Sequence, residues 1–363
     1  MFRRTRLRFT IHYEILPLFS KVGGLIDGEL IVIDGTKIRA QNSKHNCITQ
    51  SGLDKKIEYA EAQINAYLMA IAKDEALADD LTDKLKTYQE LKEQYLTQKQ
   101  ELKDEGLEQK SLTDPDSRRM KNNGSLDICY NVQSVVDAKN HFVVDISTTN
   151  DINDQNQLYT MAQKASELLE KESSTVLADT GYYNGTEIKN CVDAGMNVFI
   201  KKLKRIMLQR IMNFAKKSLY IMVKLMNTHA QQEIDYDFLK NTSKNGMKYR
   251  KYKCTDCNSC KYKKDCTTSS SGRTIQRWVH EDVLETVYNE TLNNNEVYKQ
   301  RRCIVEHPFG TIKRSLGYSF FLRRRQENVD AEAASMFIAY NFKRLLSMFS
   351  TEELVTKFEE SVM

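Results

Sequence analysis

The chain has 363 residues, of which 40% are hydrophobic and 28% charged, and its 54 basic and 49 acidic side chains give a formal net charge of +5. This composition excludes wholesale disorder, and no apolar run approaches the roughly 18 residues that cross a bilayer. We therefore expect a soluble globular protein with no membrane partner. With only 3 Pro and 14 Gly, a turn-rich all-β fold is disfavoured as well.

The first predicted strand is the apolar run from Leu30 to Ile33, which stops at Asp34. Residues 54–108 then repeat apolar side chains at three- and four-residue spacing, with no Pro and no Gly before Gly106. This pattern predicts an amphipathic helical hairpin, bent near residues 73–80.

The middle of the chain predicts alternating strands and helices. The predicted elements are a β-hairpin (129–136 with 141–146), a helix from Leu158 to Leu169, a strand (175–178) that ends at Asp179, a helix (186–194) and a strand (197–200). Helical patterns return at 280–313 and 329–349. Strand, helical insert, hairpin, helix, strand, helix, strand is an α/β order with a mixed sheet.

Asp34 and Asp179 each directly follow a buried strand, in the segments IDGTKIRA and ADTGYY. In open α/β sheets, functional sites gather at the carboxyl ends of the strands. The alternative for either residue alone is an ordinary loop or helix-capping aspartate. Two such aspartates together favour a site.

A third acid lies in the segment from Tyr298 to Tyr318. Arg302, Glu306 and Lys313 are spaced by four and seven residues and would share one face of a helix. An exposed Arg–Glu ion pair is the alternative. However, Glu306 is the one acid among eight Lys and Arg side chains between residues 299 and 325, which suggests metal binding beside a phosphate track.

Taken together, these segments resemble the DDE insertion-sequence transposases, in the group with a Tyr-Arg-Glu-Lys signature around the third acid. The resemblance covers most of residues 15–345, and its segments are VIDGTKIRA, LTDPDSRRM, YNVQSVVD, VLADTGYYN and RRCIVEHPFGTIKRSLGY. It implies an RNase H-like mixed sheet flanked by helices, with a helical insertion after the first strand and a Cys-containing insertion before the last catalytic helix.

The resemblance also implies the site and its chemistry. Asp34, Asp179 and Glu306 would be the catalytic triad and would hold two Mg²⁺ (or Mn²⁺) ions for DNA cleavage and strand transfer. The DNA-binding residues would be Tyr298, Arg302, Lys313 and Arg314, although a core role for Tyr298 is an equal alternative. The implied partner is double-stranded DNA, both the terminal inverted repeats of the element and the target, bound by a homodimer.

The expected parts of the chain follow from this reading. They are a residual N-terminal segment (1–27), the catalytic core (28–53 and 111–200), the helical hairpin insertion (54–110), a basic and Cys-containing insertion (201–279), the C-terminal catalytic helices (280–349) and a tail (350–363).

Four of the eight cysteines, Cys254, Cys257, Cys260 and Cys266, form the cluster CTDCNSCKYKKDC, and the other four are scattered. Four thiolates this close predict a structural Zn²⁺ site; free thiols or an iron–sulfur cluster are the alternatives. The scattered cysteines indicate a reducing compartment, and the N-terminus has no signal-peptide core, so we expect a cytoplasmic, nucleoid-associated protein.

Trp278 stands in the same insertion, at the end of a polar, basic strand. It could stack on a base flipped out of the DNA, which makes it a further DNA-binding candidate. The alternative, which we favour, is a structural role in which Trp278 anchors the insertion to the core.

Two departures from the family bear on activity. Only about thirty residues precede Asp34, so the chain is expected to be N-terminally truncated. Residues 203–240 do not match, and residues 201–226 carry eight basic side chains, four Met and no acid, which suggests a compensated pair of frameshifts. A family-like segment in another reading frame of the coding DNA would support this hypothesis. The alternatives to an active transposase are an inactive DNA-binding remnant and an RNase H-like nuclease.

The charge is strongly segregated. Residues 54–108 hold fourteen acids and eight lysines, a net charge of −6, so the rest of the chain carries +11. The predicted helical hairpin is therefore an acidic arm on a basic body.

Overall fold

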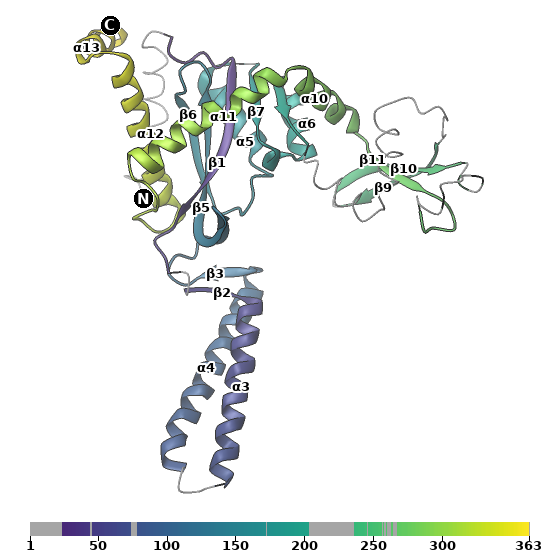
Figure 1. Cartoon of the computed structure of the whole chain (residues 1–363), viewed down its shortest axis with the longest axis vertical. Helices are drawn as coiled ribbons and strands as arrows, with labels where there is room; N and C mark the ends of the chain where they lie inside the picture. The colour runs from purple at the N-terminus through teal and green to yellow at the C-terminus, as the bar shows by residue number, and fades with distance from the viewer. Residues whose placement is uncertain are drawn as a thin grey trace. The chain divides into compact units, whose positions relative to one another are not determined.

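The structure is a computed structural model of the whole chain (Figure 1). It describes residues 24–43, 46–73, 78–171, 173–202, 236–244, 246–255, 257, 259, 263 and 267–362. The N-terminal arginines, the bend predicted near residues 73–80 except at its ends, and nearly all of the unmatched segment 203–240 lie outside these residues. None of the helices in the described part is long and apolar enough to cross a lipid bilayer.

The chain divides into two compact units. The first includes residues 34–154 and 304–363, and the second includes residues 28–33 and 155–303. Strand β1 (Leu30–Arg39) contributes to both, because its first four residues fall in the second unit and the rest in the first.

In the first unit, β1 lies beside β5 (Ser125–Asp137). Strand β5 pairs antiparallel with β4 (Arg118–Asn122) along its first part and with β6 (Val143–Thr149) along the rest. From Asp127 onward every residue of β5 is buried, so this strand is covered on both faces.

In the second unit, residues 30–33 of β1 pair in parallel with β7 (Thr175–Ala178), which pairs in parallel with β8 (Asn197–Ile200). The hydrogen-bonded order through the shared strand is β4–β5–β1–β7–β8, with β6 also on β5. The predicted mixed sheet is confirmed, and each of its predicted strand segments contains a strand, although β1 runs past its predicted end.

Helix α12 (Gln326–Met348) packs on β6 in the first unit. Asn341 accepts a hydrogen bond from the Val143 N–H and donates one to the Val143 carbonyl, both at 2.9 Å. Buried Asp330 accepts the Thr148 N–H at 3.0 Å. These polar contacts, made without access to water, fix the register of the helix on the strand.

Three helices pack together in the second unit. They are α5 (Leu158–Leu169), α6 (Gly185–Asp193) and α10 (Glu281–Asn293). Helix α6 contacts α5 and α10, and α10 also contacts β8. Thr291 of α10 accepts the Ile200 N–H at 3.1 Å, which ties this helix to the end of β8.

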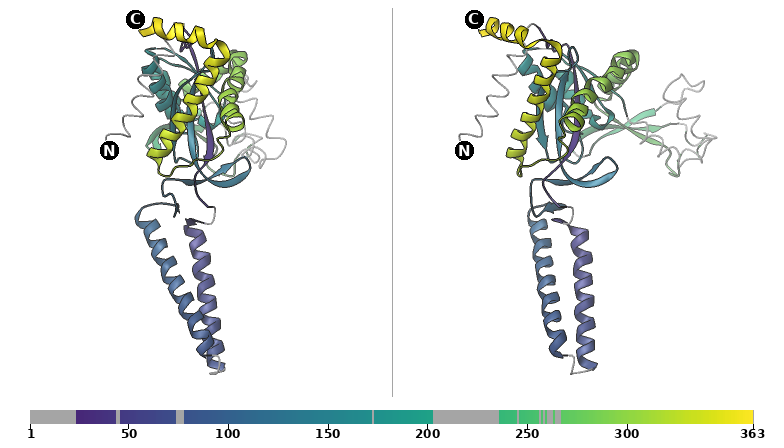
Figure 2. Two further views of the ribbon diagram at one scale, coloured as in Figure 1. Left: turned by 90° about the vertical axis from the view of Figure 1, so that its left-hand side faces the viewer. Right: turned by 60° about the vertical axis from the view of Figure 1, so that its left-hand side comes forward.

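The predicted helical hairpin is confirmed as α3 (Gln50–Lys73) and α4 (Ala78–Asp104), which stand on the short strand pair β2 (Cys47–Thr49) and β3 (Gln109–Ser111). Figures 1 and 2 show the two helices side by side beyond these strands. At the base, Ile48, Leu53 and Leu102 form a small core. We call residues 50–104 the arm.

Residues 236–278 form a separate three-stranded antiparallel sheet in the second unit. Its strands are β9 (Tyr236–Lys244), β10 (Met247–Cys254) and β11 (Thr274–Trp278), with β10 in the middle. The sequence predicted only β11; the alternation in β10, MKYRKYKC, is interrupted between Lys251 and Tyr252, where the pairing with β9 shifts register.

The helix that carries the third acid runs through Pro308, although proline disfavours the helical conformation at the residue before it. Helix α11 (Asn295–Gly310) continues past Pro308 and then widens into a π-helical turn, η5 (Thr311–Ser315). Pro308 has no N–H to give to the carbonyl of Ile304, so one helical hydrogen bond is missing just before the turn.

Residues 350–363, predicted as a tail, contain helix α13 (Thr351–Val362). Ser350 and Glu353 form a capping box: the Ser350 N–H donates to the Glu353 carboxylate at 2.8 Å and the Glu353 N–H donates to the Ser350 hydroxyl at 3.2 Å. The Ser-x-x-Glu spacing in the sequence is the local signal for this helix start.

Candidate active site

Asp34 and Asp179 follow an in-register pair of residues on parallel strands. Ile33 of β1 lies opposite Ala178 of β7, and each aspartate is the next residue of its chain segment. The sequence placed Asp34 at the end of its strand, but β1 continues to Arg39. The apolar run ends where pairing with β7 ends, at Ile33, and β1 then continues beside its other neighbour, β5.

The Asp34 side chain is half-buried and one carboxylate oxygen accepts the N–H of Gly35 at 2.9 Å. Its backbone carbonyl accepts the hydroxyl of Ser134 on β5 at 3.4 Å. These contacts hold the backbone at Asp34 against the middle strand of the first unit.

Asp179 is the N-cap of a short 3-10 helix, η4 (Thr180–Tyr182), and its carboxylate accepts the N–H of Gly181. The side chain is half-buried. Asp179 therefore fills the capping role that the sequence offered as an alternative. A cap also fixes the direction of the carboxylate, so this role is compatible with metal binding.

Tyr298 of α11 lies close to Asp179 in the second unit. Its ring is 9% exposed, and the Lys201 ammonium lies 4.6 Å from the ring centroid. Burial raises the pKa of the Tyr298 hydroxyl and Asp179 adds to this, while Arg301 and the backbone of Lys201 act in the opposite direction. This setting matches the alternative of a core tyrosine.

Glu306 is exposed on α11, and a chain of hydrogen bonds holds His307, the residue after it. His307 Nδ1 lies 2.8 Å from the hydroxyl of Tyr340 on α12, and this hydroxyl donates to the His141 carbonyl at 2.7 Å. Because the hydroxyl has a single proton, we assign His307 Nδ1 as the donor. Tyr340 is 1% exposed, so this network sets the rotation of α11 next to Glu306.

Lys313 is bound to the strand that carries Asp34. Its ammonium in η5 donates to the Thr36 hydroxyl at 2.5 Å and to the Lys37 carbonyl at 3.1 Å. Thr36 is two residues beyond Asp34, so both side chains belong to one face of β1. Burial lowers the pKa of Lys313.

The remaining predicted DNA contacts fall into two classes. Arg302 and Arg314 are exposed. Trp278 is 8% exposed, and a Cβ atom at Gly185 would lie 3.3 Å from its ring, so the ring packs against α6. The structure therefore favours the anchoring role of Trp278 that the sequence offered as its alternative.

Two residues of the cysteine cluster are described, and Cys260 and Cys266 lie outside the described residues. Cys254 and Cys257 are buried, and the Cys257 sulfur accepts the Arg273 N–H at 3.1 Å. Gly272 has φ +91°, and a Cβ there would lie 2.8 Å from the Cys257 Cβ. A buried sulfur that accepts a backbone N–H is suited to a metal-bound thiolate.

Sequence reasoning missed a buried polar network on β5. One oxygen of Asp154 accepts the amides of Asn131 at 2.6 Å and Gln133 at 2.8 Å, and the Lys37 ammonium lies 3.2 Å away. Two amide side chains in an otherwise apolar strand were the available signal. The network ties the loop after β6 to the part of β1 that follows Asp34.

Residues 229–346 match the family model described as "Transposase DDE domain". The chain is therefore similar to DDE transposases. The DDE-domain match supports a transposase and includes Trp278, Tyr298, Arg302, Glu306 and Lys313.

Among solved structures, the chain is similar to the cryo-EM structure of a piggyBac transposase synaptic complex with hairpin DNA. The TM-score is 0.34 and the identity 8%, over 99% of this chain and 58% of that one, so the chain spans less than two thirds of the length of that transposase. No curated protein matches the sequence.

Proposed function

We propose that the chain is a DDE transposase that cleaves DNA strands and transfers them in the transposition of an insertion sequence. The observation that carries this proposal is the register of Ile33 and Ala178, because Asp34 and Asp179 are the residues that directly follow this pair on neighbouring parallel segments. The family match covers the segment of Glu306, which supports this residue as the third acid. The strand order, with β6, β5, β1, β7 and β8 in sequence across the sheet, supports an RNase H-like core.

Asp34, Asp179 and Glu306 would hold Mg²⁺ or Mn²⁺. The donor set fits, because carboxylates on regular elements are the hard oxygen ligands that these ions prefer. When bound, the metal supplies charge compensation at the phosphate and activates the attacking hydroxyl. The hydrogen bonds that Asp34 and Asp179 accept from neighbouring N–H groups orient their carboxylates before any metal arrives.

The basic side chains would bind the DNA backbone. Lys313 is restrained by Thr36 and Lys37 and would place one positive charge beside the Asp34 strand. Arg302 and Arg314 are exposed and would bind phosphates, for which the guanidinium fork is well suited. The partner in this proposal is double-stranded DNA. A homodimer would bind the paired ends of the element, and the protein would act in the cytoplasmic nucleoid.

The test is nicking of an oligonucleotide duplex that carries the inverted repeat flanking the gene. With Mg²⁺ or Mn²⁺ the full chain should nick the duplex, and chelation with EDTA should abolish nicking. Asp34→Asn, Asp179→Asn and Glu306→Gln should each reduce the rate by about 100-fold or more, while DNA affinity changes by less than about threefold.

Asp193→Asn is the matched control, because Asp193 is an exposed carboxylate at the end of α6. It should nick like the unchanged chain. If the chain binds the duplex but never nicks it, the inactive-remnant alternative holds. If Asp179→Asn nicks the duplex at the same rate as the unchanged chain, the nicking comes from a contaminating nuclease. Nicking of unrelated duplexes at the same rate would favour the RNase H-like nuclease.

A further inference from the structure

The segment between η5 and α12, residues 316–325, is irregular but tightly held within the first unit. Glu332 of α12 accepts the N–H groups of Leu322 at 2.9 Å and Arg323 at 3.0 Å, one on each carboxylate oxygen. Further along, the Arg325 N–H donates to Asp114 at 3.1 Å. We call residues 316–325 the clamped loop.

Phe321 anchors the clamped loop in the core. Its side chain is fully buried, and its ring packs edge-on against Tyr130 with the centroids 6.0 Å apart. Its N–H donates to the carbonyl of Arg39 at 2.8 Å, which attaches the loop to the last residue of β1. A loop fixed by both its backbone and its central side chain is preorganised.

The residues on either side of Phe321 are turned outward. Phe320 is 46% exposed and Leu322 is 65% exposed, and Arg323 and Arg324 are exposed next to them. Within the described part of the chain, Arg39, Arg323 and Arg324 form no ion pair. The carboxylate of Glu332 accepts two backbone N–H groups of this loop.

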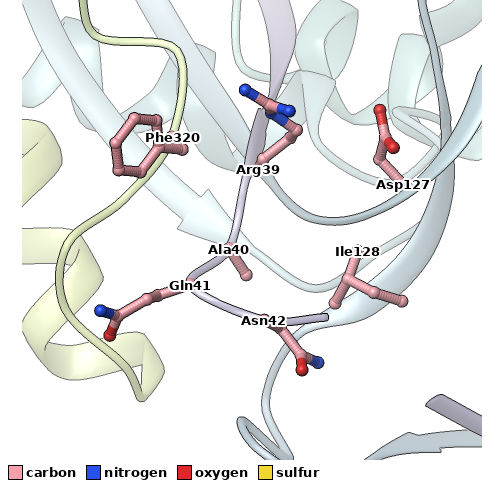
Figure 3. A pocket seen from close by; sticks show the side chains of 7 residues that line it. All are labelled: Arg39, Ala40, Gln41, Asn42, Asp127, Ile128 and Phe320. Carbon is pink, nitrogen blue, oxygen red and sulfur yellow. The ribbon is translucent and has the colours of Figure 1, made fainter. Parts of the chain in front are cut away.

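A small pocket adjoins this surface (Figure 3). Its volume is about 280 Å³, and it is lined by Arg39, Ala40, Gln41, Asn42, Asp127, Ile128 and Phe320. Figure 3 shows Phe320 and Asp127 on opposite sides of Arg39, above the apolar Ala40 and Ile128. The volume is at the lower end for ligand pockets, which suits one flat group better than a peptide.

We propose that the clamped loop and this pocket bind a nucleotide unstacked from DNA, with its base on Phe320 and its phosphates on Arg39, Arg323 and Arg324. An exposed aromatic ring beside unpaired guanidinium groups is the chemistry that binds single-stranded nucleic acid, because each base offers a face for stacking and each phosphate a charge. Asp127 also lines the pocket and accepts the Ser125 hydroxyl at 2.9 Å, and its carboxylate would accept hydrogen bonds from the base edge. This proposal rests on the proposed function, which makes DNA the partner.

The distance between Asp34 and Arg39 along β1 predicts how far the bound nucleotide lies from the cleaved phosphate. Asp34 and Arg39 are five residues apart on one strand, a span of about 17 Å at roughly 3.3 Å per residue. One strand of B-DNA advances about 3.4 Å per nucleotide. If the cleaved phosphate lies at Asp34 and the duplex axis runs along β1, the unstacked base lies about five nucleotides away.

Fluorescence anisotropy with a labelled 20-nucleotide dT strand and a 20-base-pair duplex tests the binding without knowledge of the element ends. Phe320→Ala should weaken single-strand binding by about 5- to 100-fold and duplex binding by less than about threefold, while Phe320→Tyr should bind normally. Arg323→Gln and Arg324→Gln should weaken both and each lower the single-strand salt slope by about 0.7. Tyr59→Ala, which alters a 58% exposed aromatic on the arm, is the matched control and should change nothing.

A second experiment maps the nucleotide. 5-Iodouracil at single positions of the inverted-repeat duplex should crosslink to Phe320 most strongly about five nucleotides from the nick. The proposal is overturned if Phe320→Ala binds the single strand as tightly as the unchanged chain does. It is also overturned if this variant loses a dimer but keeps normal DNA affinity, because Phe320 would then belong to a protein interface.

Different results would contradict the nucleotide site and the transposase function. A chain that nicks DNA but is indifferent to Phe320→Ala contradicts only the nucleotide site. A chain whose DNA affinity depends on Phe320 but that never nicks contradicts only the transposase chemistry, and Asp179→Asn should keep the dependence on Phe320 in either case.

Discussion

Trp278 is the clearest case in which burial separates two roles of one residue. Its ring packs against Gly185 and is 8% exposed, so truncation would open a large cavity. We expect Trp278→Ala to lower the free energy of unfolding by about 3–5 kcal/mol in urea denaturation, and Trp278→Phe to lower it less. A Trp278→Phe variant with normal stability but tenfold weaker DNA binding would instead support base stacking.

His141 predicts a pH dependence of stability. Burial lowers its pKa below the ordinary 6.5, and His307 and Arg344 lower it further. The unfolded chain therefore takes up a proton at higher pH than the folded chain does. The stability that neutral His141 contributes is complete above about pH 6.5 and is lost as the pH falls toward the lower folded pKa.

His141→Asn removes this proton uptake and suits the backbone, because residue 141 has φ +59°, a conformation that Asn tolerates. Urea unfolding between pH 5 and 8 should give a flatter stability profile for the variant than for the unchanged chain. Parallel profiles would show that His141 does not contribute.

At the scale of elements, the buried cysteines between strands β10 and β11 predict a structural metal site. Cys254 ends β10, and its N–H donates to the Arg273 carbonyl at 3.0 Å just before β11 begins. We expect about one Zn²⁺ per purified chain by elemental analysis, and Cys254→Ser or Cys257→Ser should lose most of it. Cys47→Ser, on strand β2 of the first unit, should keep it.

A stable three-stranded sheet without bound zinc or iron would contradict the metal site. Gly272→Ala gives an independent check, because the added Cβ would press on Cys257. It should lower zinc content although no cysteine is changed.

For the whole molecule, the arm keeps a strongly basic protein close to neutral. Residues 62–91 hold six acids and three lysines, so replacing them with a short uncharged linker changes the net charge from +5 to +8. The cut joins Glu61 to Lys92, whose side chains pair at 2.9 Å across the two helices, and it leaves the small core at the base intact.

The shortened chain should bind a generic DNA duplex several-fold more tightly at about 50 mM salt, with the difference fading above about 300 mM as screening shortens the range of the charges. Anisotropy titrations at several salt concentrations measure this. Equal affinities at low salt would show that the arm does not oppose DNA binding.

Local patterns in the sequence determined much of the fold. The apolar runs before Asp34 and Asp179, the helical periodicity of the arm and the turns between strands each depend on neighbouring residues. Hydrophobic burial and backbone propensity act at that range, so these elements could be predicted. The same short segments, through their resemblance to one family, also predicted the candidate catalytic and DNA-binding residues.

Tertiary structure decided what depends on partners far along the chain. Strand β5 extends β1 beyond Asp34, and Lys313 is held by Thr36 across 277 residues. The burial of Trp278 against Gly185 and the clamping of the loop by Glu332 belong to the same class. Sequence spacing contains no information on which distant groups meet, because packing of whole elements sets those contacts and hence the protonation, burial and direction of each side chain.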